Sequence, residues 1–140
     1  MKNEFVPYKI AVKLKEIGFD EPCLAWYYGP DLWMVDQKEA QPINSRKGSI
    51  RGGNGVLAPT RQSALSWFRE KHGLWVSFRY DDCDCVEKDV CWYVDHSFSY
   101  GIGPLFITNK LNDFATLEEA EIGCIGVLVD IVKNGPKHYM

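Results

Sequence analysis

Four side chains that can bind zinc lie close together in this sequence. Cys83, Cys85 and Cys91 are followed by His96, so three thiols and one imidazole fall within fourteen residues. Structural zinc sites usually separate paired cysteines by two residues, because that turn directs both sulfurs at one tetrahedral centre. The single residue between Cys83 and Cys85 does so less readily. A zinc-binding module is therefore an alternative, but we expect unpaired thiols, no bound metal and no cofactor.

The histidines offer little for nucleophilic catalysis, which needs a nucleophile beside a His that a third group orients. His72 lies at the end of a predicted helix, His96 on an extended segment and His138 near the C-terminus. Neighbouring residues of an extended segment point to opposite faces, so Asp95-His96-Ser97 is not a triad. We therefore expect a protein that is not an enzyme.

A basic, glycine-rich segment over residues 41–57 is the next candidate. Arg46, Lys47 and Arg51 stand among its glycines. Exposed backbone N–H groups and positive charge can together hold a phosphate. The segment has neither the phosphate-loop pattern nor the dinucleotide fingerprint, and we expect a long flexible loop. A nucleotide-binding or nucleotide-sequestering protein is the corresponding alternative.

Aromatic residues are more frequent than a core of this size needs. They make up 14% of the chain, with five tryptophans and seven tyrosines. Alternate strand positions point inward, so roughly half of the strand rings belong to the core and the others are exposed. Exposed rings are typical of a ligand or partner surface. We take Trp67 and Trp75 as the rings that accompany the basic loop in a ligand site.

Three helices are predicted. The first covers residues 7–17, and the second covers residues 59–72 and ends before Gly73. The third begins in the capping box Thr116-Leu117-Glu118-Glu119 and continues to Lys133.

The third helix is apolar on two faces. We therefore expect it either to be sandwiched within the fold or to form a homodimer contact. Gly123 and Gly126 each cost about 1 kcal/mol in a helix interior, which suggests that another backbone approaches closely there.

The strands are read from alternation and turn signals. Residues 23–28 and 32–35 predict a hairpin around a glycine-proline turn. Residues 74–80 alternate strictly, residues 90–94 predict its antiparallel partner, and residues 104–108 a short edge strand. The chain is thus predicted to be one α+β domain over residues 1–140, in the order α-β-β-α-β-β-(β)-α. We expect an antiparallel sheet of four to five strands with about three helices packed on it, and a frayed tail from about residue 135.

Composition limits the class of protein. The 140 residues are 46% hydrophobic and 25% charged, which is typical of a globular domain. The net charge of -3 gives no general attraction for nucleic acid, which we do not expect as a partner. The first five residues contain no apolar run and no stretch approaches the length of a membrane span, so we expect neither a signal peptide nor a membrane partner. Five cysteines, an odd number, favour reduced thiols and a cytoplasmic protein.

Three stretches carry a resemblance to a known family. They are Asn3-Glu4-Phe5-Val6-Pro7-Tyr8 with the residues up to Cys23, Ala58-Pro59 with the residues up to Lys71, and residues 116–133. They resemble a family of small uncharacterised proteins of Bacteroides genomes and their phages. The resemblance implies an origin in phage or mobile DNA and carries over no site residue. The leading hypothesis is therefore a non-enzymatic accessory protein that binds a host protein or a small ligand.

Overall fold

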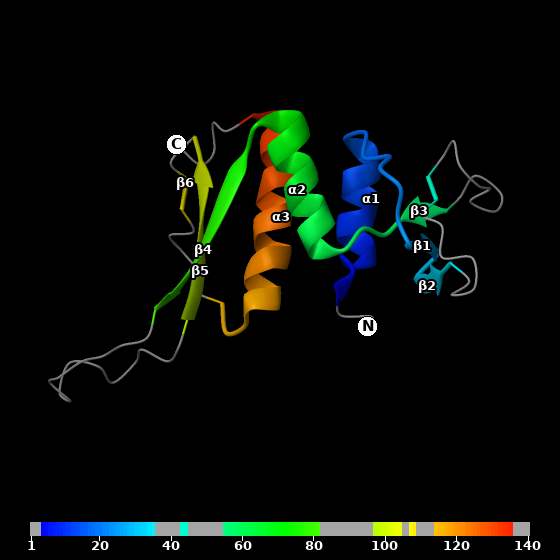
Figure 1. The fold of residues 1–140 in the computed structure, drawn as a ribbon, viewed down its shortest axis with the longest axis horizontal. Helices are drawn as coiled ribbons and strands as arrows, with labels where there is room; N and C mark the ends of the chain where they lie inside the picture. The colour runs from blue at the N-terminus through cyan, green and yellow to red at the C-terminus, as the bar shows by residue number, and fades with distance from the viewer. Residues whose placement is uncertain are drawn as a thin grey trace, which may run out of the picture.

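The computed structural model describes residues 4–35, 43–44, 55–81, 97–104, 107–108 and 114–135. It confirms the predicted α+β class, with three helices and antiparallel strands in the described part of the chain. The strands form two sheets of three, β2-β1-β3 and β4-β5-β6, where one sheet was expected. The helices lie between the two sheets (Figure 1). The elements are α1 (Tyr8–Glu16), β1 (Ala25–Tyr28), β2 (Asp31–Met34), β3 (Val56–Leu57), α2 (Arg61–His72), β4 (Trp75–Asp81), β5 (Ser97–Gly103), β6 (Ile107–Thr108) and α3 (Leu117–Asn134).

The first half of the chain builds α1 and the hairpin of β1 and β2, as predicted. Gly18, with φ of +94°, ends the turn after α1, and the buried Phe19 donates its backbone N–H to the carbonyl of Leu14 at 3.0 Å. Gly29, with φ of +59°, opens the two-residue turn of the hairpin, a position that favours glycine. The Tyr27 hydroxyl donates to the Val6 carbonyl at 2.7 Å and ties the hairpin to the segment before α1.

Strand β3 lies at the end of the segment expected to be a flexible loop, residues 41–57, of which residues 41–42 and 45–54 lie outside the described residues. Val56 and Leu57 are both buried and pair with β1. Ile43 also exchanges two backbone hydrogen bonds with Cys23, at 2.7 and 2.8 Å. Val56 and Leu57 join the sheet because both side chains are buried there, although two residues are too few to show strand periodicity.

Helix α2 ends before Gly73 as predicted, but it begins at Arg61, two residues later than predicted. The Thr60 hydroxyl accepts the Ser63 backbone N–H at 3.1 Å, and Gly73 closes the helix with φ of +64°. Arg61, in the first turn, is largely buried, and its guanidinium pairs with a carboxylate of α3.

Strand β4 alternates as predicted, but its partner is β5, a strand that contains Gly101 and Gly103 and was not predicted. The expected partner, residues 90–94, lies outside the described residues. Gly101 pairs with Ser77 on one side and Thr108 on the other, so β5 is the central strand and β6 is the short edge strand that was predicted.

Helix α3 begins at the predicted cap, where the Thr116 hydroxyl accepts the Glu119 backbone N–H at 3.2 Å. It packs against α1, α2 and β5, so of the two arrangements considered the structure has the sandwiched one. The close neighbour of Gly123 is not a backbone but the ring of Phe114, whose Cζ lies 2.7 Å from an ideal Cβ at this position. An ideal Cβ at Gly126 would have one neighbour among the described residues, Ile10 Cδ1 at 3.7 Å.

Among the described residues, no helix combines the length and the apolar character that crossing a membrane requires.

Candidate functional site

The five ligand-site residues predicted from the sequence fall into two groups. Arg46, Lys47 and Arg51 lie outside the described residues. Trp67 and Trp75 are described and are very different, with exposed fractions of 6% and 61%. They line separate recesses, so the described structure does not bring them together in one pocket.

Trp67 is mainly a core residue. Its ring makes edge-to-face contacts with Phe19 at 5.2 Å, Phe68 at 5.1 Å and His72 at 4.9 Å between ring centroids. It also lines a polar groove of about 560 Å³ between the end of α1 and the end of α2, together with Asp20 and Lys71. This groove carries charges of both signs and therefore selects no particular charge on a ligand.

The candidate metal ligands Cys83, Cys85, Cys91 and His96 lie outside the described residues. Within the described part of the chain, no group of three or more His, Cys, Asp or Glu side chains is arranged to hold a metal.

The two described cysteines are buried thiols in the core. Burial, with the Glu21 and Asp20 carboxylates adding to it, raises the pKa of Cys23 to about 12. Burial also raises the pKa of Cys124, with the Glu121 carboxylate as the second cause. Because a thiolate is the reactive form, neither group is activated as a nucleophile.

The first candidate surface is the outer face of the β2-β1-β3 sheet. The register pairs Trp26 with Trp33 and Tyr28 with Asp31, and paired residues share a face. Tyr27 points the other way, because its ring contacts Tyr8 of α1 at 5.5 Å. We call the outward residues Leu24, Trp26, Tyr28 and Trp33 the aromatic face.

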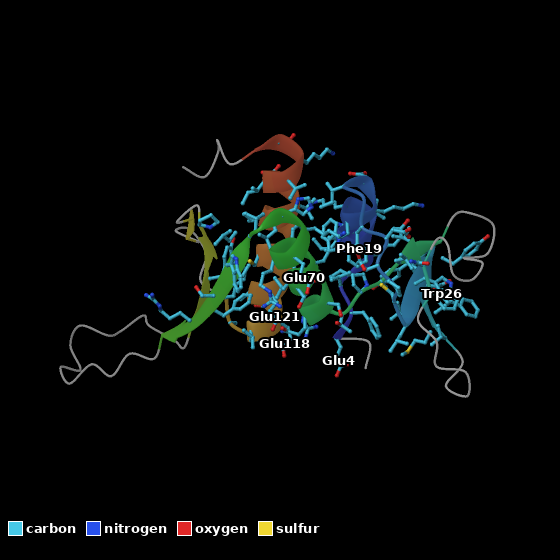
Figure 2. All side chains as sticks on the ribbon, turned by 45° about the horizontal axis from the view of Figure 1, so that its top comes forward. Glu4, Phe19, Trp26, Glu70, Glu118 and Glu121 are labelled. Atoms are coloured by element: carbon cyan, nitrogen blue, oxygen red, sulfur yellow. The ribbon has the colours of Figure 1, made fainter. Side chains whose placement is uncertain are left out.

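Exposure rises across the aromatic face toward the sheet edge. Leu57 of β3, opposite Trp26, is buried, and Trp26 is half-buried. Tyr28 and Trp33 are exposed to 50% and 54%. Among the described strands, β2 is the edge of this sheet, at the end of the molecule remote from β4-β5-β6 (Figures 1 and 2). An exposed edge strand with large apolar side chains is a site where another chain can pack.

The second candidate surface is a recess of about 250 Å³ between α2, β4 and α3. Leu65, Val76 and Phe78 supply apolar walls, and the exposed Leu117 and Trp75 lie at its rim. The Arg69 guanidinium lies over the Trp75 ring, with 5.3 Å from Cζ to the ring centroid. We call this space the Trp75 recess.

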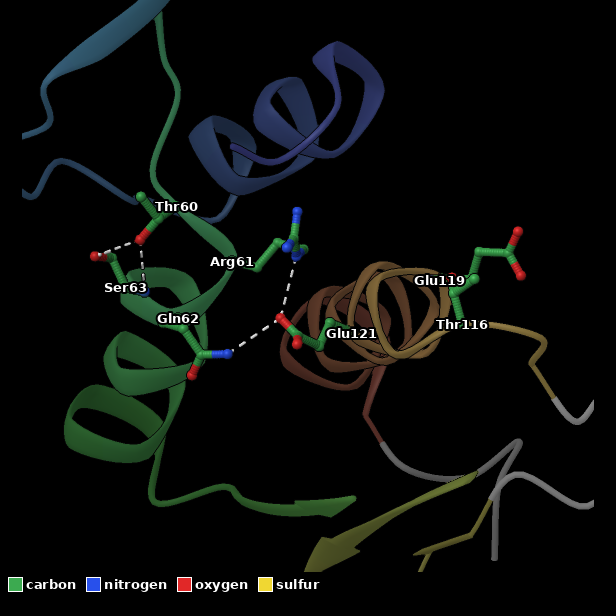
Figure 3. Close-up of polar contacts among 7 residues, drawn as sticks. All are labelled: Thr60, Arg61, Gln62, Ser63, Thr116, Glu119 and Glu121. Carbon is green, nitrogen blue, oxygen red and sulfur yellow. Dashed lines mark hydrogen bonds and ion pairs between the residues drawn. The ribbon is translucent and has the colours of Figure 1, made fainter. Parts of the chain in front are cut away.

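Glu121 is the acidic group of the Trp75 recess, and its side chain is only 5% exposed. Its Oε2 accepts from Arg61 Nε at 3.1 Å and from Gln62 Nε2 at 3.2 Å (Figure 3). Both donors come from the first turn of α2, where the Thr60 cap fixes the backbone. Arg61 Nη1 is buried and has no hydrogen-bond partner among the described residues, so the pair is not fully satisfied there.

The site residues predicted from the sequence did not include Glu121, Arg69 or Trp33. Glu121 carried a detectable signal, because it stands between Ala120 and Ile122 in a helix that is predicted to be apolar on two faces. A charged residue there requires a buried partner. The exposure of Trp33 depends on which side of the hairpin faces α1, and that is a tertiary property.

Comparison with known proteins identifies no relative of this chain. No family model matches the chain, and no curated protein or solved structure matches it.

Proposed function

We propose that this protein is a non-enzymatic binding module that holds a partner protein on its aromatic face. The observation that carries the proposal is the pair Tyr28 and Trp33, both half exposed on one side of an edge hairpin. Tryptophan and tyrosine are enriched among the residues that dominate binding energy at protein interfaces.

The size of the exposed rings sets the expected contribution to binding. A fully buried Trp or Tyr removes about 150–250 Å² from water, so covering the exposed half of Trp33 removes roughly 100 Å². At about 25 cal/mol per Å², this contributes roughly 2–3 kcal/mol before the costs of association. One ring of this kind is enough to act as an interface anchor.

The kind of partner and the cellular compartment are proposed from the sequence, and the oligomeric state is proposed from the packing of α3. The resemblance to proteins of Bacteroides genomes and their phages supports a host protein as the partner. The five cysteines, an odd number that favours reduced thiols, support the cytoplasm as the place of action. Because α3 uses both apolar faces within one chain, we propose a monomeric module rather than a homodimer through this helix.

The test is a comparison of three baits in affinity purification from a host lysate with quantitative mass spectrometry. Trp33→Ser removes an anchor of the aromatic face, and Trp75→Ser is the matched control, since it removes an equally exposed ring from the other sheet. We expect a protein that is retained by the wild type and by Trp75→Ser, and is reduced at least tenfold with Trp33→Ser. Identical retained proteins for all three baits would refute the proposal, provided that thermal unfolding shows both variants to be folded.

A further inference from the structure

Glu121 lines the Trp75 recess, and one of its two carboxylate oxygens, Oε1, can still accept hydrogen bonds. A carboxylate offers about four acceptor sites over its two oxygens. Arg61 and Gln62 both donate to Oε2, and no donor among the described residues reaches Oε1. The side chain is more than nine-tenths buried and lines the recess, so a donor bound there would meet an acceptor that is shielded from bulk water.

The charges around the recess favour a neutral donor over a cation or an anion. The Glu121 carboxylate is already paired with the Arg61 guanidinium, so an incoming cation would gain little net attraction. Arg69 at the rim adds a positive charge that disfavours a second cation. An anion would meet the Glu121 carboxylate. A neutral N–H group gains a charge-assisted hydrogen bond without these penalties.

The shape of the recess favours a flat ring. Its volume of about 250 Å³ is just below the range of drug-sized pockets, which matches a single or fused ring rather than a larger ligand. Leu65, Val76 and Phe78 provide apolar walls, and Trp75 provides an aromatic surface at the rim. The guanidinium of Arg69, stacked on Trp75, helps to hold that ring in position.

We infer that the Trp75 recess binds a small neutral heteroaromatic ring, which packs against Trp75 and Phe78 and donates a ring or exocyclic N–H to Glu121. A nucleobase and an indole share this chemistry. This site lies on the other sheet from the aromatic face and does not depend on the proposed protein partner.

A pair of isosteric probes tests the inference. Indole carries an N–H where benzofuran carries an ether oxygen, and the two rings are otherwise nearly the same shape. In titrations followed by ¹⁵N–¹H correlation spectra, we expect indole to shift the side-chain N–H signal of Trp75 in a saturable way. We expect benzofuran to bind at least about tenfold more weakly, because it offers no donor to Glu121. Equal affinities, or no saturable shift up to the solubility of indole, would overturn the inference.

Two variants and a second probe complete the experiment. Trp75→Ala should weaken indole binding at least about tenfold, whereas Trp33→Ala on the aromatic face should leave it unchanged. Unchanged binding to Trp75→Ala would place indole elsewhere and contradict the inference. Titration with adenine distinguishes the two ligand sources: tighter binding of adenine than of indole would identify a nucleobase site, and the reverse order would identify an indole site.

Discussion

Two glycines in the same helix should respond in opposite directions to the same substitution. Replacing a glycine in a helix interior with alanine stabilises the helix by about 1 kcal/mol. At Gly126 the new Cβ would meet only Ile10 Cδ1 at 3.7 Å, an ordinary contact. We therefore expect Gly126→Ala to raise the free energy of unfolding by about 1 kcal/mol and the melting temperature by roughly 3–5 °C.

At Gly123 the same methyl group meets the ring of Phe114. Its ideal position lies 2.7 Å from Cζ and 2.9 Å from Cε1, so the ring must move. The Phe114 ring also packs near Tyr100, with 6.1 Å between centroids. Overpacking of this kind costs about 1–3 kcal/mol. After the gain in helix propensity, Gly123→Ala should lower the free energy of unfolding by about 1 kcal/mol.

The assay is urea unfolding of both single variants, together with Gly123→Ala in a Phe114→Leu background. Leucine lacks the far end of the ring, so the added methyl should stabilise that background as it does at Gly126. Equal changes in stability for Gly123→Ala and Gly126→Ala would show that the Phe114 ring does not obstruct the new methyl group, as would an effect of Gly123→Ala that Phe114→Leu leaves unchanged.

Three further predictions concern the buried pair, a thiol and a cap. Glu121→Gln should lower the free energy of unfolding by about 3 kcal/mol in urea titrations, because it leaves the Arg61 charge buried without a counterion. As a control, substitution of the exposed Glu118 by Gln should change the free energy of unfolding by less than about 1 kcal/mol. Equal effects of the two substitutions would mean that the buried pair does not stabilise the fold. Burial raises the pKa of the Cys23 thiol from 9.0, its value in the unfolded chain, to about 12 in the folded protein. The thiol therefore contributes its full stabilisation below pH 9. Above pH 9 the free energy of unfolding should fall by up to ~1.4 kcal/mol per pH unit because of this thiol. Urea titrations at pH 7, 9 and 10 under reducing conditions should therefore show a shallower fall for Cys23→Ala than for the wild type. Thr60→Ala should cost about 1 kcal/mol in thermal unfolding by removing the cap of α2, whereas an unchanged melting temperature would mean that the bond from Ser63 contributes nothing.

The helices could be predicted because their signals are local. Thr60 and Thr116 cap N–H groups three residues away, and Gly73 ends α2 in the left-handed conformation. Each of these contacts spans at most a few residues, so the sequence window around it contains all the information that is needed.

The strands that were missed depend on partners far along the chain. Val56 and Leu57 pair with Tyr27 and Trp26, about thirty residues earlier, and two residues show no periodicity of their own. In β5, Gly101 and Gly103 indicate a loop locally, and only the register with β4 makes the segment a strand. The division into two sheets follows from the helices that fill the space between them, which no local pattern encodes.

The candidate surfaces also depend on contacts between residues far apart in the sequence, which local patterns do not predict. The sequence could identify an excess of aromatic residues and select Trp75, but it could not tell that Trp67 is buried against Phe19 and Phe68. The pairing of Arg61 with Glu121 joins the first turn of α2 to α3, sixty residues apart, and so could not be read from either helix alone.

The central claim, that the aromatic face holds a partner protein, is tested most directly by site-specific photocrosslinking in the host cell. A benzophenone amino acid would replace Trp33 in one variant and the exposed Arg79 of β4 in a control. The account predicts a single discrete adduct from position 33 and none from position 79. No adduct from position 33, or the same mixture of adducts from both positions, would contradict it.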